Sequence, residues 1–407
     1  MQTALAEDIR DTPAGREADR ILRACVHCGF CTATCPTYQL LGDELDGPRG
    51  RIYQIKQVLE GAEPGPHVRE HLDRCLTCRS CETTCPSGVQ YGRLLDIGRS
   101  QVERRLPRPA GQRWLRRALL LLLPHPRRFG AVLRLGRLFR PMLPAALRRK
   151  VPVAQPTGPW PAARHARRML VLDGCVQPSA APQIDAAAAR VLDRLGISLV
   201  KAPGAGCCGA VAHHLSVEEQ ALNTARRNID AWLPALEQGA EALLVTASGC
   251  AAHLKEYGHL LRDDPIYATR AARVTTAIKD LVEVLEAENL TPLGRVRDHQ
   301  PLAFHAPCTL QHGERLGGRV EALLRRLGFE LTPVPDAHLC CGSAGTYSIL
   351  QPELSGQLRE RKLAALHSGN PARIATANIG CLLHLDEGST SPVVHWVQLL
   401  DELSSGA

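Results

Sequence analysis

At 407 residues the chain is long enough for two or three domains, and 44% hydrophobic with only 4% aromatic residues is typical of a folded protein. Sixteen cysteines would indicate a disulfide scaffold in a short secreted protein, but residues 1–20 are highly charged and lack the apolar core of a secretory signal. We therefore expect metal-binding cysteines in a reducing cytoplasm. The net charge of +8 favours an acidic partner or an anionic surface, while the lack of any run near ~18 apolar residues argues against a membrane span, and no motif indicates nucleic acid binding.

The stretch from Cys25 to Pro86 contains one cysteine pattern twice, C-x2-C-x2-C-x3-C-P. This spacing is typical of bacterial two-cluster ferredoxins, in which the fourth cysteine of each run reaches the other cluster. We therefore assign one [4Fe–4S] cluster to Cys25, Cys28, Cys31 and Cys85, and a second to Cys75, Cys78, Cys81 and Cys35. Zinc sites and disulfides are the alternatives. A zinc site needs only four ligands and does not require this repeated spacing with its final proline.

Helices are expected around both cysteine runs. Residues 17–24 lead straight into Cys25, and residues 51–60 place Ile52, Ile55, Val58 and Leu59 on one face. Another helix should deliver Cys75. These helices predict an α-helical ferredoxin domain over residues 1–100.

Residues 101–165 form a basic segment. No acidic residue occurs between Glu103 and Asp173, and residues 104–150 contain fourteen Lys or Arg. Four prolines should divide the segment into short helices. One interpretation is an amphipathic segment that lies on a membrane or docks a partner, and the other is a solvated helical linker.

From residue 168 onwards strands alternate with helices, which predicts parallel sheets covered on both faces. The expected strands are residues 169–172, 198–201, 242–246, 302–305, 331–334 and 373–376. The expected helices are residues 184–195, 217–236, 275–288, 318–327, 353–366 and 394–403. We divide this region into domains 166–290 and 295–407.

The cysteines show that these two domains are a repeat. The first set is Cys175, Cys207, Cys208 and Cys250, and the second is Cys308, Cys340, Cys341 and Cys381. The first cysteine precedes the pair by 32 positions in both sets. Because each cysteine follows a predicted strand, we expect each set to converge at the carboxyl edge of a sheet and to form a further metal or redox site. The alternatives are vicinal disulfides and inert buried thiols.

The Cys-Cys-Gly sets resemble the cysteine-rich (CCG) domains of heterodisulfide reductase, of the iron–sulfur subunit of anaerobic glycerol-3-phosphate dehydrogenase and of lactate-utilisation proteins. A two-cluster module ahead of two such domains narrows the resemblance to the family of bacterial glycolate oxidase iron–sulfur subunits. The segments of this chain that resemble the family are residues 22–40, residues 42–51, residues 246–250 and Leu-Cys-Cys-Gly-Ser-Ala-Gly-Thr-Tyr at 339–347. This family implies an α + α/β fold: a helical ferredoxin module followed by two α/β CCG domains with parallel sheets.

The chain departs from the heterodisulfide reductase pattern at the last element of each set. That relative has C-x-x-C, whereas here His253 follows Cys250 and His384 follows Cys381 with the same spacing. Noncubane clusters bound by five cysteines are therefore in doubt. Histidine can ligate iron, so both histidines are candidate ligands, and surface or supporting histidines are the alternative.

No nicotinamide fingerprint, P-loop or Gly-x-Ser-x-Gly is present, so these residues indicate an electron carrier without hydride chemistry. The resemblance implies an FAD-containing partner that oxidises glycolate, or D-lactate, and passes electrons through this chain towards quinone. It also implies a peripheral position on the inner face of the bacterial inner membrane. The rival interpretations are a glycerol-3-phosphate or lactate dehydrogenase subunit, a heterodisulfide-reductase-like catalytic subunit, and a non-redox scaffold.

Overall fold

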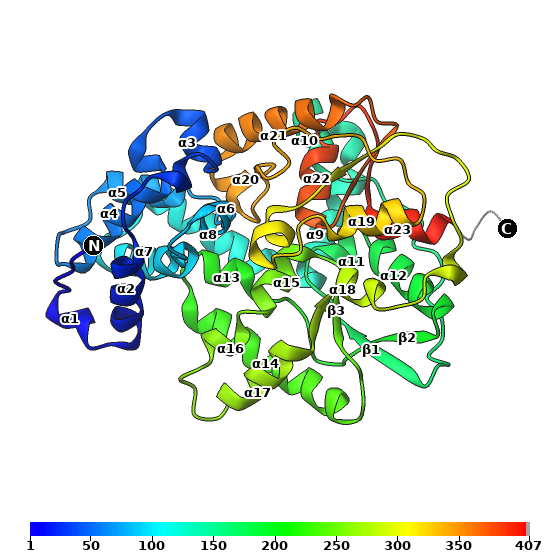
Figure 1. Cartoon of the computed structure of the whole chain (residues 1–407), viewed down its shortest axis with the longest axis horizontal. Coiled ribbons are helices and arrows are strands. Elements are labelled where there is room, and N and C mark those ends of the chain that lie inside the picture. Colours follow the sequence, from blue (N-terminus) through cyan, green and yellow to red (C-terminus); the bar gives the residue numbers. More distant parts are fainter. Residues whose placement is uncertain (404–407) are drawn as a thin grey trace. The chain divides into compact units, whose positions relative to one another are not determined.

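The computed structural model describes residues 1–403, coloured from blue at the N-terminus to red in Figure 1. Contacts divide the chain into two compact units. The first consists of Met1–Arg117, His214–Ser216 and His338–Lys362, and the second of Ala118–His213, Val217–Ala337 and the residues from Leu363 onwards. The last four residues of the predicted domain 295–407 lie outside the described part of the chain.

The first unit is helical. Four of its helices begin at a proline, a residue suited to the first helical position because the N–H it lacks would have no partner there. Its elements are α1 (Glu7–Arg10), α2 (Pro13–Ala24), η1 (Phe30–Thr32), α3 (Pro36–Leu41), η2 (Glu44–Asp46), α4 (Pro48–Leu59), α5 (Pro66–Asp73), α6 (Ser80–Thr84), α7 (Tyr91–Arg105) and α20 (Tyr347–Leu350).

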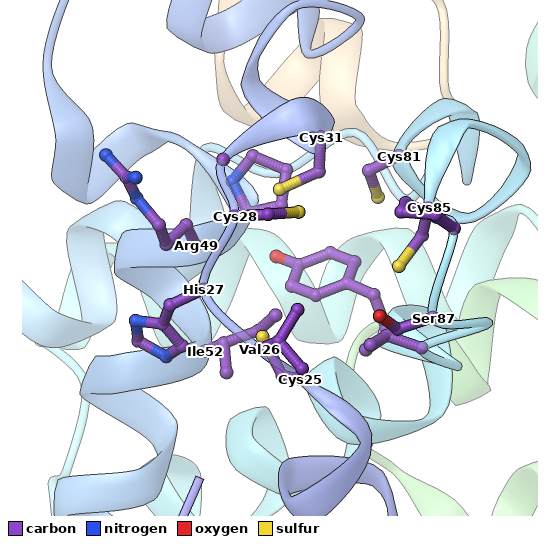
Figure 2. A pocket seen from close by; sticks show the side chains of 15 residues that line it. Cys25, Val26, His27, Cys28, Cys31, Arg49, Ile52, Cys81, Cys85 and Ser87 are labelled. Atoms are coloured by element: carbon purple, nitrogen blue, oxygen red, sulfur yellow. The ribbon is translucent and has the colours of Figure 1, made fainter.

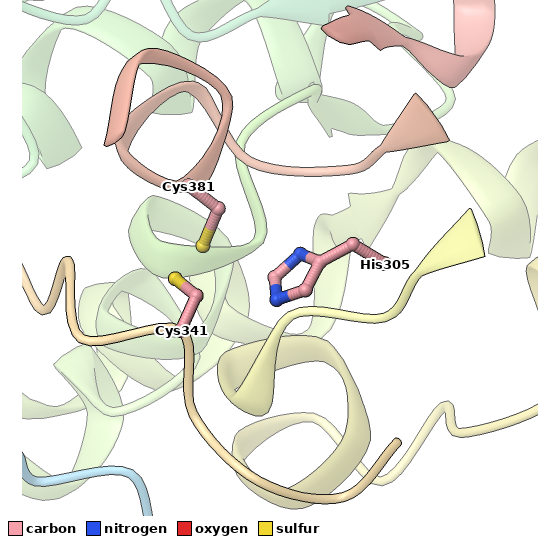
Figure 3. A group of neighbouring side chains, drawn as sticks. All are labelled: His305, Cys341 and Cys381. Carbon is pink, nitrogen blue, oxygen red and sulfur yellow. The ribbon is translucent and has the colours of Figure 1, made fainter. Parts of the chain in front are cut away.

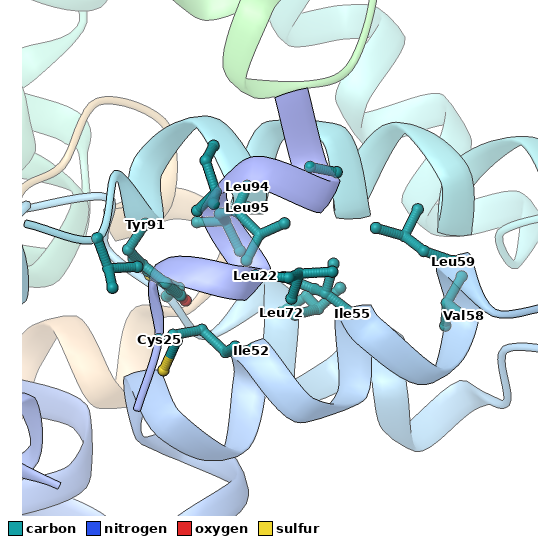
Figure 4. Close-up of a cluster of buried hydrophobic side chains, with 14 of the residues drawn as sticks. Leu22, Cys25, Ile52, Ile55, Val58, Leu59, Leu72, Tyr91, Leu94 and Leu95 are labelled. Carbon is teal, nitrogen blue, oxygen red and sulfur yellow. The ribbon is translucent and has the colours of Figure 1, made fainter. Parts of the chain in front are cut away.

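One apolar core holds this unit together. The expected face of α4 is confirmed, since all four of its apolar residues are buried, and it packs against Leu94 and Leu95 of α7 (Figure 4). Gly98 permits this close approach, because a Cβ there would lie 2.6 Å from Cγ1 of Ile55. The helices thereby fix the loops that carry the first eight cysteines.

The basic segment forms the short helices that its prolines predict. They are α8 (Ala110–Leu122), α9 (Pro126–Leu138), η3 (Arg140–Met142) and α10 (Ala145–Lys150). Among the helices of residues 1–403, none combines the length and the apolar character needed to cross a membrane.

The second unit contains two parallel sheets. The first has the order β2-β1-β3-β4 and is formed by β1 (Arg167–Val171), β2 (Ile197–Lys201), β3 (Leu243–Val245) and β4 (Ile278–Asp280). In its register Leu170 lies opposite both Val200 and Leu243. Its helices are α11 (Gln177–Ala180), α12 (Gln183–Arg194), α13 (Ala210–His214), α14 (Glu218–Glu237), α15 (Ser248–Leu254), α16 (Tyr257–Leu260), α17 (Ala268–Ala277) and α18 (Leu281–Glu286).

The second sheet has the order β5-β6-β7 and is formed by β5 (Leu302–His305), β6 (Arg373–Thr376) and β7 (Val393–His395). The other elements of this part of the chain are η4 (Thr291–Leu293), the π-helical turn η5 (Thr309–Gly313), α19 (Arg319–Arg326), α21 (Pro352–His367), α22 (Ile379–Asp386) and α23 (Trp396–Glu402). The expected fold class, α + α/β with parallel sheets, is confirmed.

Three sequence-based elements are wrong in detail. Residues 331–334 make only a single bridge, between Leu331 and Leu302, because Pro333 has no N–H to continue a ladder. The expected helix 275–288 is interrupted by strand β4, and the expected helix 394–403 begins with strand β7. These two strands are only three residues long, too short to show a period.

The carboxyl ends of the two sheets adjoin within the second unit. Beyond β3, the backbone N–H of Ser248 donates to the carbonyl of Ala377 beyond β6 at 3.1 Å. Nε2 of the buried His395 lies 2.8 Å from the carbonyl oxygen of Thr246. The strand ends that precede Cys250 and Cys381 are therefore neighbours.

Candidate metal centres

The first candidate centre is a pocket in the helical unit. Figure 2 shows Cys25, Cys28, Cys31 and Cys85 around one hollow. Cys25 ends α2, Cys31 lies on η1 and Cys85 ends α6, so elements from both cysteine runs supply thiols to it. The four thiols assigned to the first cluster thus line one pocket.

The second candidate centre is a neighbouring pocket lined by the other four cysteines: Cys35, Cys75, Cys78 and Cys81. Cys35 caps α3 and Cys81 lies on α6. Cys81 also lines the first pocket, but the thiols that act on it electrostatically are Cys78, Cys75 and Cys35. The grouping of thiols therefore crosses between the two runs.

The two cysteine runs share an unusual backbone. His27 and Thr77, the residues before the second cysteine of each run, both have φ near 55°. Gly29 and Arg79, the residues after it, also have positive φ, at 86° and 59°. Left-handed non-glycine residues each cost roughly 1–3 kcal/mol and cluster at functional sites. The strain points to loops shaped for a ligand.

The thiols of these pockets need a cation. Burial raises the pKa of Cys25 and Cys81, and raises that of Cys31 to about 11. Neighbouring thiols raise all three further, so four thiolates would repel one another without a bound metal. Two sets of four convergent cysteines are the donor set of two [4Fe–4S] clusters, so the residues fit the expected group.

Polar residues that the sequence analysis did not single out surround the second pocket. The hydroxyl of Tyr91 donates to Sγ of Cys75 at 3.6 Å, and Oγ1 of Thr37 lies 3.3 Å from Sγ of Cys35. The guanidinium of Arg51, which is 1% exposed, also lines the pocket. Arg51 is the last residue of the segment 42–51, which resembles the glycolate oxidase family. This resemblance is the sequence signal that could have identified Arg51.

The first CCG set is a connected group of thiols in the second unit. Sγ of Cys208 lies 3.4 Å from Sγ of Cys250. The thiols of Cys175 and Cys208 both hydrogen-bond to Cys207 and hold its pKa well below the usual range. Tyr257 supports the pair by donating its hydroxyl to the carbonyl of Cys208 at 2.6 Å. The structure therefore brings all four residues of this set together.

The Cys-Cys-Gly turn has the same geometry in both sets. The N–H of Gly209 points to Sγ of Cys207, and that of Gly342 to Sγ of Cys340, each at 3.5 Å. Their φ angles are 91° and 92°. At Gly342 a Cβ would lie 2.6 Å from the carbonyl oxygen of Ser355, so only glycine fits.

The second CCG set is distributed over both units: Cys340 and Cys341 belong to the first, and Cys308 and Cys381 to the second. Figure 3 shows Cys381 on α22, Cys341 in the loop before α20, and His305 at the end of β5. A ring nitrogen of His305 lies within 4.8 Å of Sγ of Cys381. The sequence analysis did not predict a role for His305. When the two repeats are aligned at Cys175 and Cys308, His305 stands opposite Leu172. The histidine in place of an apolar residue is the signal that could have identified it.

The histidines of the C-x-x-H elements are both buried. His253 packs edge-to-face on Tyr257 and tilts against His213, with ring centroids 5.9 and 5.2 Å away. His384 lies on α22, one turn after Cys381. All sixteen cysteines are thiols, so neither Cys-Cys pair is a vicinal disulfide.

Two protein-family models match the parts of the chain that contain these cysteines. A model described as "4Fe-4S dicluster domain" matches residues 21–89. A model described as "Cysteine-rich domain" matches residues 169–255 and 302–386. The eight cysteines of the two candidate pockets therefore lie in the first matched region, and all eight CCG cysteines lie in the other two.

The chain is also similar to known proteins over its whole length. It is 57% identical to the glycolate oxidase iron-sulfur subunit of Escherichia coli over 99% of both chains. It is 32% identical to the probable glycolate oxidase iron-sulfur subunit of Bacillus subtilis, over 94% of this chain and 93% of that protein. Lactate utilization protein A of Bacillus licheniformis is 29% identical over 49% of this chain and 82% of its own.

Proposed function

The chain belongs to the family of glycolate oxidase iron–sulfur subunits; from this premise we propose that it carries electrons, one at a time, from an FAD-containing partner to a membrane acceptor. The partner would oxidise glycolate to glyoxylate, and D-lactate would be a second substrate of the same kind. The observation that carries the proposal is the pair of neighbouring pockets that all eight cysteines of the two runs line, with cysteines of both runs in each pocket.

The residues of the module have distinct roles in this function. Cys25, Cys28, Cys31 and Cys85 would hold one cluster, and Cys35, Cys75, Cys78 and Cys81 the other. Each [4Fe–4S] cluster, when bound, supplies a one-electron redox group. Three of these cysteines, Cys25, Cys75 and Cys81, are buried in the apolar core of the helical unit, which positions the two cysteine loops.

The CCG domains would provide a further redox or metal site. The four thiols of the first set, each in contact with at least one other, support metal binding there. In the second set, the small residues of Cys-Cys-Gly-Ser-Ala-Gly allow the backbone to approach a bound group closely, so we place the site that meets the acceptor or the flavoprotein in residues 295–407.

We further propose that the chain is peripheral on the inner face of the membrane. Helices α9 and α10 and the residues beside them carry an apolar–basic patch in the second unit. The patch comprises the exposed residues Leu121, Val132, Leu135, Leu138, Phe139, Met142 and Leu147 and, among them, Arg127, Arg128 and Arg134. Apolar side chains between arginines suit the interface of an anionic bilayer.

A lactate-oxidising complex is the second candidate, because lactate utilization protein A is similar over half of the chain. The test is anaerobic copurification of the chain with its partner subunits, followed by dye reduction with glycolate and with D-lactate. We expect about eight irons per chain from the helical module and faster reduction with glycolate. Iron near zero after anaerobic reconstitution would overturn the electron-transfer role, and activity with lactate alone would favour the second candidate.

A further inference from the structure

A fully buried cation lines only one of the two cysteine pockets of the described helical unit. The guanidinium of Arg51 is held by three acceptors: the carbonyl of His71 at 2.7 Å, Oγ1 of Thr37 at 3.1 Å and Oδ1 of Asp46 at 3.2 Å. Thr37 is in turn the residue that contacts Cys35. Arg51 therefore cannot turn away to solvent, and its charge is fixed beside the second pocket.

Among the described residues, the carboxylate in direct contact with Arg51 is shared. Asp46 is fully buried and also accepts a hydrogen bond from Arg74 at 2.9 Å. Burial lowers the pKa of Arg51, but Cys75, Tyr91, Cys35 and Asp46 together hold it above its usual value. Cys35 and Cys75 thus lie near a buried positive charge, and the carboxylate that contacts this charge, Asp46, is shared with Arg74.

The first pocket has a weaker cation. Arg49, two residues earlier on α4, is the only Arg or Lys among the residues that line it. Its side chain is 38% exposed and pairs with Glu44 at 2.6 Å. Water and this carboxylate screen its charge, so it acts less on the pocket than Arg51 does on the other.

We propose that Arg51 raises the reduction potential of the cluster site formed by Cys35, Cys75, Cys78 and Cys81 above that of its neighbour. Adding one electron to this site adds a negative charge and no proton, and a buried cation stabilises that charge strongly at low dielectric. Under the proposed function, on which this inference rests, the electron comes from the reduced flavoprotein. Electrons in the module would therefore collect at the second site.

The second site is also where the CCG loop 338–347 reaches the module. The hydroxyl of Tyr347 donates to the carbonyl of Arg74 at 3.1 Å, within the first unit. Burial raises the pKa of Tyr347, and both Cys75 and Cys340 raise it further. The ring of Tyr347 is therefore near one thiol of the second pocket and one thiol of the second CCG set. The site to which we assign the higher potential is thus the one near Tyr347, whose ring is also near Cys340.

The test is a redox titration of the reconstituted full chain, followed by electron paramagnetic resonance. The spectrum that changes in Cys28→Ala identifies the first cluster. In Arg51→Gln, the midpoint potential of the second cluster should become more negative while that of the first stays in place. In Asp46→Asn, which removes the carboxylate but keeps the cation, it should become more positive. Arg51→Lys should be intermediate, and Arg49→Gln, the matched control, should not move the second cluster.

The outcomes separate this inference from the proposed function. If the wild-type chain shows no pair of cubane signals, the proposed function fails. If both signals are present but Arg51→Gln leaves the second potential unchanged, or moves both potentials equally, the role of Arg51 is overturned. Should Arg51→Gln fail to fold, the sign of the shift in Asp46→Asn decides, and a shift to more negative potential contradicts the proposal.

Discussion

At the scale of single residues, the Cys-Cys-Gly turn depends on its glycine. Gly342→Ala places a methyl group against backbone, the carbonyl of Ser355, in a left-handed conformation. We expect it to lower the free energy of unfolding by about 2 kcal/mol or more, measured by denaturant unfolding of the metal-free chain. Gly356→Ala, on helix α21 with open space around its Cβ, is the control and should be neutral or stabilising. Equal effects of the two variants would contradict this account.

A buried acidic group predicts how stability depends on pH. Lys255 pairs with Glu283 at 2.6 Å and Glu314 at 2.8 Å, and Asp280 lies close by. Burial, reinforced by Asp280, raises the pKa of Glu314 from 4.5 to about 9. Burial raises the pKa of the neighbouring Asp280 as well, to about 7. The folded chain therefore keeps protons on these two carboxyl groups that the unfolded chain loses, and stability falls as pH rises from about 4.5 to about 9.

Glu314→Gln should reduce this loss, because glutamine carries no charge at any pH and only Asp280 then remains to lose its proton. We expect the variant to unfold at nearly the wild-type temperature at pH 5, and at a higher temperature at pH 8.5, with a gain on the order of 1–3 kcal/mol. The exposed Glu360→Gln serves as control and should follow the wild-type profile. If Glu314→Gln and the wild type lose stability in parallel between these pH values, Glu314 is ionised in the folded chain.

At the scale of elements, the sequence predicted those with strong periodic signals. The apolar face of α4 follows from side-chain spacing, and strands β1, β2, β3, β5 and β6 follow from short apolar runs between helices. The short strands β4 and β7 could not be predicted, because each runs directly into a helix and tertiary pairing decides the conformation of its three residues. Pro333 had the opposite effect: the apolar run around it suggested a strand that its missing N–H prevents.

The candidate sites were predictable to the extent that cysteine spacing describes them. The spacing predicts a metal or redox role for all sixteen thiols and a crossed grouping of the first eight, and the two pockets contain cysteines of both runs. It could not find Arg51 or His305, because a buried arginine and a strand-end histidine are recognised only by what surrounds them in the fold. The clustering of Cys340 and Cys341 with the helical unit likewise depends on tertiary contacts, here those of Tyr347.

The apolar–basic patch is an element whose role can be measured. Leu138 and Met142 are 71% and 80% exposed beside the arginines of α9. We expect the wild-type chain to sediment with vesicles that contain phosphatidylglycerol and to be released by salt, since its arginines are attracted to the anionic surface. The double variant Leu138→Glu and Met142→Glu should lose this binding.

The matched control is Ile266→Glu, because Ile266 is an exposed apolar residue (64%) of the same unit outside the patch. It should sediment with vesicles like the wild type. If the double variant still binds vesicles, the patch is a plain linker rather than a membrane contact. If the wild type never binds vesicles but the variant no longer copurifies with the flavoprotein, the patch is a protein interface.

At the scale of the whole molecule, the chain order and the compact units differ in an informative way. Residues 338–362 come after the first CCG domain and within the second, yet their contacts group them with the helical module. Cys340 is thus part of the unit that contains the two cysteine pockets, while Cys308 and Cys381 lie on elements of the other unit. Cys340 therefore belongs to the helical unit by its contacts and to the second CCG set by its sequence. Such a residue is suited to pass electrons from the ferredoxin module to the CCG cysteines.

This organisation leads to a prediction about Cys340. Cys340→Ser replaces the sulfur by a smaller oxygen and leaves the backbone unchanged, so the turn at Gly342 and the contact of Tyr347 with Arg74 should persist. We expect both cubane signals in electron paramagnetic resonance to remain, because Cys340 is in neither pocket, while glycolate-dependent dye reduction by the assembled complex falls at least several-fold. Ser348→Ala, next to Tyr347 on α20, controls for disturbance of the loop. Full activity in Cys340→Ser, and in the other seven CCG cysteine variants, would mean that electrons leave the module without these domains; loss of a cubane signal would instead show that Cys340 supports the module itself.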